Sequence, residues 1–195
     1  DRKELSESFH LHMMPNLGKS NGKEIMKYAK EGDIGTTDIQ FIINGAFKES
    51  GLLILLNEYI SSKTGNRPFG DNFNVKNAPK SSEELIRACA QNIPRSQMPL
   101  LIGVGDTVTS IKAKSEDGWL RGGSDRGFLS LIQDLGKEFN KENQIVFVNS
   151  SNDEVFRPTY NEETMQGVSD INDNLKFNIV FTGGSEEYIS WFLKL

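Results

Sequence analysis

Three features are scarce in this chain of 195 residues, and each scarcity excludes a class of protein. A single cysteine, Cys89, rules out a disulfide within the chain and favours a reducing, cytoplasmic setting. The longest apolar run, residues 52–56, is far too short to cross a bilayer, so we expect no membrane partner. The formal net charge of −5, without a basic stripe, argues against nucleic-acid binding.

The remaining composition is that of an ordinary globular protein. Hydrophobic residues make up 36% of the chain and charged residues 25%, which is enough to build a core of useful size at this length. The first residue is Asp1 rather than Met, and no signal peptide opens the sequence. We therefore expect the chain to be part of a longer polypeptide.

A short apolar run, residues 100–104, is followed by Gly105 and Asp106. The run lacks polar alternation, which predicts a strand buried on both faces. Ligands of open α/β sheets bind outside the carboxyl ends of the strands, so Asp106 is well positioned to hold a metal or a phosphate-bearing substrate. A turn aspartate that caps the next segment explains the same spacing equally well.

A glycine-rich turn, Arg121-Gly-Gly-Ser-Asp-Arg-Gly127, precedes a helical pattern that carries Phe128, Leu131, Ile132 and Leu135. Free backbone N–H groups and the helix dipole suit a phosphate at such a helix N-terminus. Arg121 or Arg126 can add a bidentate fork to that phosphate. Surface arginines beside a flexible loop are the competing interpretation, with equal weight.

The amino-terminal quarter predicts a strand and two helices. Residues 8–14 resemble a strand in which His10 and His12 share a face, and we interpret them as surface or half-buried histidines rather than metal ligands. A capping box predicts a helix from residue 21, with Lys23 in a first turn where the dipole opposes a cation. A second helix is expected from residue 35, with Asp38 as a dipole partner or a pocket ligand.

The rest of the chain alternates helices and strands. Helices are expected over 52–65, 81–91 and from 185, the first either separate from the helix before it or joined to it at a kink at Ser50-Gly51, and the last with Tyr188, Ile189 and Phe192 facing inward. Strands are expected over 145–148 and 175–181, with a small hairpin or an excursion beside the pocket around Asp117-Gly118. Residues 66–80 are rich in Gly, Asn and Pro, which predicts a loop long enough for a lid or a specificity loop, and the polar, acidic residues 157–174 predict a surface loop. This order predicts an α/β domain with a mainly parallel sheet.

Five blocks, in order along nearly the whole chain, resemble those of the glucosylglycerol-phosphate phosphatases, salt-tolerance enzymes of the haloacid-dehalogenase-like superfamily. The blocks are Pro15-Asn-Leu-Gly18, Gly22-Lys-Glu-Ile25, Gly35-Thr-Thr-Asp38, Gly103-Val-Gly-Asp-Thr-Val-Thr-Ser110 and Arg121-Gly-Gly-Ser-Asp-Arg126. The resemblance implies a haloacid-dehalogenase-like Rossmannoid core, with a mainly parallel sheet flanked by helices. Residues 1–20 would end a cap or linker, and 21–195 would form the carboxyl-terminal portion of the phosphatase core.

The same resemblance implies a Mg²⁺-dependent phosphatase whose partner is a small-molecule sugar phosphate. It would convert glucosylglycerol 3-phosphate to the compatible solute glucosylglycerol. In this superfamily one aspartate attacks phosphorus, a second protonates the leaving group, and a lysine and a downstream acid hold phosphate and metal. Matched by motif, Asp106 is the metal acid and Lys23 the lysine, while Asp125 can serve as a second metal acid. The residues assigned to substrate binding are Asp38, Thr107, Arg121, Ser124 and Arg126.

Two departures from the superfamily pattern limit what this chain does alone. No apolar strand ends in Asp-x-Asp, since Asp170-Ile-Asn-Asp173 has the wrong spacing, and Ser110 stands where many relatives carry a further acid. We therefore expect the nucleophile to lie in a missing amino-terminal segment of the same polypeptide and this chain alone to be inactive. The alternative is a non-catalytic module of the same ancestry that binds a sugar phosphate or a partner protein. A third possibility is a phosphatase for another sugar phosphate.

Overall fold

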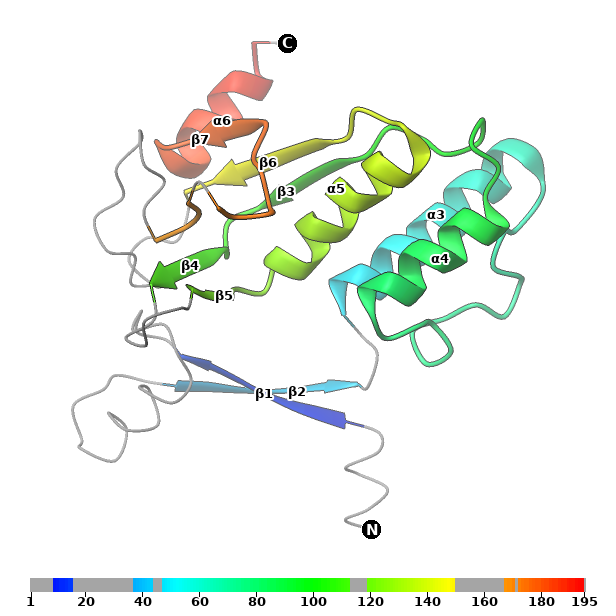
Figure 1. Ribbon diagram of the computed structural model, residues 1–195, viewed down its shortest axis with the longest axis horizontal. Coiled ribbons are helices and arrows are strands. Elements are labelled where there is room, and N and C mark those ends of the chain that lie inside the picture. Colours follow the sequence, from blue (N-terminus) through cyan, green and yellow to red (C-terminus); the bar gives the residue numbers. More distant parts are fainter. Residues whose placement is uncertain are drawn as a thin grey trace. The chain divides into compact units, whose positions relative to one another are not determined.

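The chain forms α/β structure, as the sequence predicts (Figure 1). The computed structural model describes residues 9–15, 37–43, 47–112, 119–149, 167–170 and 172–194, with the backbone alone at 9–15, 37–43, 111, 112 and 120. Two compact units result, one made of residues 1–11, 41–103 and 127–144, and the other of 12–40, 104–126 and 145–195. No helix in the described ranges is both long and apolar enough to span a membrane.

Helices α3 (Lys48–Thr64) and α4 (Ser82–Asn92) pack together in the first unit (Figure 1). α3 ends at Gly65, whose φ of 75° is the left-handed conformation that glycine adopts without strain. α4 begins at the predicted capping box, in which Ser81 Oγ accepts the Glu84 N–H at 3.2 Å and Glu84 Oε2 accepts the Ser81 N–H. Both helix predictions are confirmed.

The thiol of Cys89 is fully buried on α4. Desolvation in this site raises the pKa of Cys89 to about 12, so the thiolate is not populated near neutral pH. Cys89 therefore serves as a small apolar side chain of the core rather than as a nucleophile or a redox group.

Residues 66–80 form the predicted loop, and α3 holds its first part in place. The buried Asn57 of α3 donates from Nδ2 to the Gly70 carbonyl at 3.2 Å and accepts the Phe69 N–H on Oδ1 at 2.9 Å. The rings of Phe69 and Phe73 lie 4.9 Å apart. Because a buried amide satisfies the loop backbone, this part of the loop is a fixed element of the first unit.

Helix α5 (Arg126–Phe139) covers one face of strand β3 (Ile102–Gly105). A Cβ at Gly103 would lie 2.7 Å from Ile132 Cδ1 and 2.9 Å from Leu129 Cδ2, so a larger residue there would displace these side chains. On the other face, Ile102 and Val104 remain 60% and 38% exposed. The prediction of a strand buried on both faces is therefore wrong, because one helix covers one face and the side chains alternate.

Strand β6 (Gln144–Val148) is the centre of a sheet in the order β3-β6-β7. Strand β7 (Ile179–Phe181) runs parallel to β6, with Val148 opposite Phe181. Helix α6 (Gly184–Phe192) packs on β7, where the Phe181 ring lies 5.3 Å from that of Tyr188 (Figure 1). The parallel arrangement confirms the predicted α/β class.

Strands β4 (Thr109–Lys112) and β5 (Trp119–Gly122) form the predicted antiparallel pair, with Ser110 opposite Arg121. Because the strand pair begins three residues after Asp106 and ends four residues before Arg126, it connects the two segments that carry the candidate site. All of these residues belong to the second unit.

The helix expected from residue 35 is wrong. Residues 37–43 form strand β2 (Thr37–Ile43), which pairs with β1 (Phe9–Pro15) in a two-stranded sheet. The apolar residues Ile39, Phe41 and Ile43 recur with a period of two as well as fitting a helical stripe, and β-branched side chains favour the strand. The predicted strand at residues 8–14 is confirmed by β1. The helix expected from residue 21, with Lys23, lies outside the described residues.

Three further predictions need correction near the carboxyl terminus. Of the strand expected over 175–181, only β7 forms. Just before it, the Asn178 side-chain oxygen, rather than a backbone carbonyl, accepts the Ile145 N–H at 2.7 Å. α6 leaves Ile189 and Phe192 more than half exposed rather than inward-facing. The described part of the polar stretch 157–174 is not a surface loop, since Val168, Ser169 and Asp173 are buried.

Candidate functional site

The turn after β3 is braced by one buried carboxylate. Asp125, only 4% exposed, accepts the N–H groups of Asp106 and Thr107 on a single oxygen, at 3.0 Å and 2.9 Å. Its own N–H donates to the Thr107 carbonyl at 3.1 Å. The Thr107 hydroxyl in turn donates to Asp106 Oδ1 at 2.8 Å. These bonds fix the backbone beneath Asp106 and orient its carboxylate.

Gly123 brings the glycine-rich turn against the same segment. Its φ is +99°, and a Cβ there would lie 2.1 Å from the Thr107 carbonyl oxygen. No other residue fits such a backbone conformation at such a distance. One reason for the glycine in this turn is therefore close backbone approach to residues 107 and 108, alongside any role as a phosphate cradle.

The carboxylate oxygens at this turn can supply some of the ligands that a Mg²⁺ ion needs. Mg²⁺ prefers carboxylate oxygens and usually keeps several waters beside one or two protein carboxylates. Asp106 meets that requirement, whereas Asp125 already uses one oxygen on two backbone N–H groups. Within the part of the chain that the structure describes, no group of three or more acids, histidines or cysteines gathers as a cation site. Metal binding by Asp106 and Asp125 stays a prediction.

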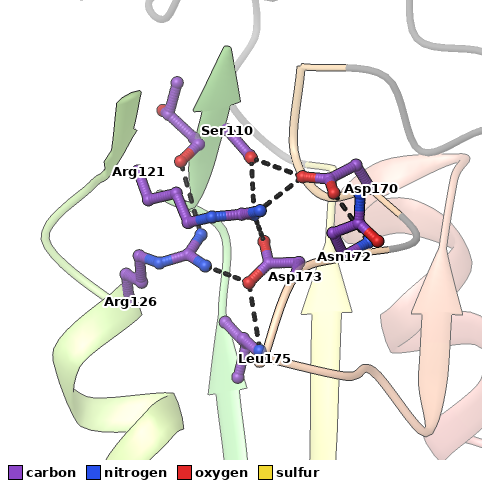
Figure 2. A network of polar contacts seen from close by, with 8 residues as sticks. Ser110, Arg121, Arg126, Asp170, Asn172, Asp173 and Leu175 are labelled. Carbon is purple, nitrogen blue, oxygen red and sulfur yellow. Dashed lines mark hydrogen bonds and ion pairs between the residues drawn. The ribbon is translucent and has the colours of Figure 1, made fainter. Parts of the chain in front are cut away.

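A second polar cluster joins the two arginines of the turn to two acids from residues 167–175 (Figure 2). Arg121 Nη1 lies 2.7 Å from Asp170 Oδ2 and 2.6 Å from Asp173 Oδ2, and donates to Ser110 Oγ at 2.9 Å. Arg126 Nη2 pairs with Asp173 Oδ1. Two positive and two negative side chains thus balance in one cluster.

The backbone and Ser110 complete this cluster. Asp170 accepts the Asn172 N–H at 2.8 Å and the Ser110 hydroxyl at 3.2 Å, and Asp173 accepts the Leu175 N–H at 3.0 Å. The Ser110 N–H also donates to the Gly167 carbonyl at 2.8 Å. Ser110 therefore contacts a carboxylate, that of Asp170, which lies 60 residues away in the sequence.

The cluster favours the charged forms of Asp170 and Arg121. Burial opposes ionisation of the Asp170 carboxyl, but hydrogen bonds from Arg121, the Asn172 N–H and Ser110 outweigh it and lower the pKa of Asp170. Burial likewise opposes the charge of Arg121, but its bond to Asp170 and the charge of Asp173 raise the pKa of Arg121. Both groups are therefore ionised at neutral pH.

This pKa shift predicts acid sensitivity. A carboxyl whose folded pKa is lowered stabilises the fold fully above its unfolded pKa, about 4, and loses that contribution as the pH falls through the lower folded value. We expect Asp170→Asn to reduce the free energy of unfolding at pH 7 and to flatten its fall below pH 4. Urea unfolding at several pH values measures this. Parallel pH curves for the variant and the wild type would contradict the assigned role of Asp170.

The structure brings some of the candidate residues together and leaves others apart. Asp106 and Thr107 lie in one turn, and Asp125 bonds to that turn from the glycine-rich segment. Ser124, which is exposed, lies next to Asp125 in the same segment. Asp38 lies on β2, where only the backbone is described, and Lys23 lies outside the described residues.

Sequence reasoning did not assign Asp170 and Asp173 to the site. Charge is the feature that could have indicated them, because two acids without an assigned role follow the two arginines, in a polar stretch without periodicity, and could neutralise them. Their partners lie tens of residues away, 47 in the case of Arg126 and Asp173, so no local spacing shows the pairing.

Comparison with known proteins decides the family. The family model described as glucosylglycerol-phosphate phosphatase matches residues 1–195. The chain belongs to the glucosylglycerol-phosphate phosphatase family. The glucosylglycerol-phosphate phosphatase of Synechocystis sp. is 44% identical over 200 residues, which cover 96% of this chain and 47% of that protein. The chain therefore spans about half the length of this curated relative. No solved structure matches it.

Membership of the glucosylglycerol-phosphate phosphatase family confirms the resemblance carried by the five sequence blocks. Two of those blocks, Gly103–Ser110 and Arg121–Arg126, meet in the structure through Asp125 and Gly123. The most specific blocks of the glucosylglycerol-phosphate phosphatase pattern are therefore also the segments that form the candidate site.

Proposed function

We propose that the full-length protein carrying this chain is a Mg²⁺-dependent phosphatase that hydrolyses glucosylglycerol 3-phosphate to glucosylglycerol, a compatible solute made for salt tolerance. The observation that carries the proposal is the family match over the whole chain. The braced Asp106 turn supports it, because an acid at the carboxyl end of a β-strand occupies the usual ligand position of an α/β sheet. A haloacid-dehalogenase-like reaction and a cytoplasmic location belong to the same proposal.

Arg121 and Arg126 are proposed to bind the substrate phosphate. Among the described residues, the three polar partners of the Arg121 guanidinium all contact Nη1, and no acceptor contacts Nε or Nη2. The side chain of Arg121 is 24% exposed, and its guanidinium carbon lies 5.5 Å from the Trp119 ring centroid. The two remaining donor nitrogens offer the planar fork that matches two oxygens of a phosphate. Thr107 and Ser124 would add hydroxyl donors.

Asp106 would hold Mg²⁺, which when bound neutralises charge on the phosphoryl oxygens. The Asp106 carboxylate is suited to that task because Thr107 orients it and Asp125 fixes the backbone below it. Asp125 can offer its second oxygen, and Lys23 is proposed to balance the phosphate charge. Each of these groups acts by position and charge, as phosphoryl transfer requires.

The attacking carboxylate is proposed to lie outside residues 1–195. The relative is about twice as long as the region that matches, which leaves room for the Asp-x-Asp segment. β3 lies at an edge of the described sheet, and its Ile102 side chain is 60% exposed. An edge strand with exposed apolar side chains is a place where another strand can pair, and such a strand would end beside Asp106.

The test is phosphate release by the full-length protein from a panel of sugar phosphates, with and without Mg²⁺. We expect glucosylglycerol 3-phosphate to give the highest kcat/KM, and chelation of the metal to abolish release. Faster hydrolysis of another sugar phosphate would replace the proposed substrate. Binding of the panel without any release would favour a non-catalytic sugar-phosphate-binding module instead.

A further inference from the structure

One carboxylate, that of Asp173, links both arginines of the candidate phosphate site. Its Oδ2 lies 2.6 Å from Arg121 Nη1, and its Oδ1 pairs with Arg126 Nη2 (Figure 2). Arg121 belongs to β5 and Arg126 begins α5, so the two guanidiniums come from different elements. Among the described residues, Asp173 is the acid that contacts both guanidiniums.

Asp173 is itself held rigidly. Its side chain is 0% exposed, and Oδ1 also accepts the Leu175 N–H at 3.0 Å. Within the part of the chain that the structure describes, its Oδ2 makes no hydrogen bond and is held by the charge of Arg121 alone, so the carboxylate is the shared counter-charge of the two arginines. Without that charge Arg121 keeps Asp170 and Ser110, and Arg126 keeps the Thr109 carbonyl at 3.4 Å, but no other described residue joins the two guanidiniums.

Asp170 makes a useful contrast. Among the described residues its polar partners are Arg121, Ser110 and the Asn172 N–H, and Arg126 is not one of them. Its side chain is 11% exposed, and Ser110 still holds Arg121 Nη1 when Asp170 is changed. Loss of Asp170 therefore removes one contact from one arginine, whereas loss of Asp173 removes a contact from each of the two arginines.

We infer that Asp173 is a positioning residue, which holds Arg121 and Arg126 in the arrangement that binds the phosphate of the substrate. The inference rests on the proposed function, because it requires that these arginines meet a phosphate. The N–H groups on Nε and Nη2 of Arg121 are the donors left for that phosphate, while Nη1 stays bound to the acids. Asp173 acts through the arginines and does not touch the substrate.

The test is Asp173→Asn in the full-length protein, which keeps the side-chain shape and removes the charge. We expect KM for glucosylglycerol 3-phosphate to rise about 10-fold to 100-fold, as for loss of one or two charge-assisted bonds, with kcat within about 3-fold of wild type. The inhibition constant of inorganic phosphate should rise in parallel. Asp170→Asn, the matched variant, should raise KM by less.

A purely structural role for Asp173 gives a different result. In that case Asp173→Asn lowers Tm and the active fraction, while KM and the inhibition constant of phosphate stay unchanged, and the inference is overturned. If Asp173→Asn does not fold, Asp173→Glu keeps the charge and lengthens the arm. This variant should also raise KM, and an unchanged KM would overturn the inference.

Calorimetric binding of inorganic phosphate separates this inference from the proposed function. If the wild type binds phosphate without hydrolysing any sugar phosphate, and Asp173→Asn weakens that binding, the proposed function fails and the positioning role stands. If hydrolysis is normal but Asp173→Asn binds phosphate as the wild type does, the positioning role fails alone. A wild type that binds no phosphate at all overturns the positioning role.

Discussion

Asp106→Asn should abolish phosphate release by the full-length protein, with a fall in kcat of about 10³-fold. A metal ligand that stabilises charge on the transferred group contributes several kcal/mol to the transition state, and about 1.4 kcal/mol corresponds to a factor of ten. An asparagine keeps the shape of the side chain and can still accept the bond from Thr107, so the fold should survive. Steady-state kinetics with saturating Mg²⁺, together with thermal unfolding, measure both expectations.

The matched control for this variant is Asp71→Asn. Asp71 lies in the loop after α3 with its side chain 90% exposed, so the same substitution should leave both activity and Tm close to wild type. Unchanged activity in Asp106→Asn would refute the assignment of Asp106 to the site. A large loss of stability in Asp106→Asn would mean that the turn depends on its charge.

Gly123→Ala should damage both stability and activity. The substitution puts a Cβ 2.1 Å from the Thr107 carbonyl oxygen at a φ of +99°, so the backbone of one turn or the other must move. We expect the free energy of unfolding to fall by about 3 kcal/mol, the upper part of the range for strained backbone and steric overlap. Displacement of Thr107 also disturbs the Asp125 brace, so kcat should fall with stability.

The neighbouring glycine supplies the control. An alanine Cβ at Gly122 would meet no atom within 4 Å, and this residue has no positive φ. Gly122→Ala should therefore change the free energy of unfolding by less than about 1 kcal/mol. Equal losses at the two positions would contradict the role assigned to the close approach at Gly123.

Local patterns predicted most of the fold. The capping box at Ser81, the apolar periodicity of α5 and the Asp117-Gly118 turn each depend on neighbouring residues, and the structure confirms the elements that they predict. The failures arose where a short pattern fits two periods or depends on packing. Residues 37–43 fit a helix and a strand, and the exposure of Ile102 depends on what covers β3.

The sequence indicates the candidate site only in part. It marks Asp106, Arg121 and Arg126 as candidates because each stands near a strand end or a helix start, where residue type alone suggests a ligand, and their role there stays a prediction. The pairing of the arginines with Asp173 was not found, since it joins residues far apart in the sequence through a segment without periodicity. The sequence also does not show that Asp125 accepts the N–H groups of Asp106 and Thr107, because this contact forms only when two segments distant in the sequence come together in the fold.

The central claim is that this chain supplies the Asp106 turn and the arginine cluster of a phosphatase whose nucleophile lies elsewhere in the polypeptide. The most direct measurement compares phosphate release from glucosylglycerol 3-phosphate by the full-length protein and by residues 1–195 alone, at equal concentration with Mg²⁺. We predict metal-dependent release by the full-length protein and none by the isolated chain. Release by residues 1–195 alone, or no release by the full-length protein, would contradict the account.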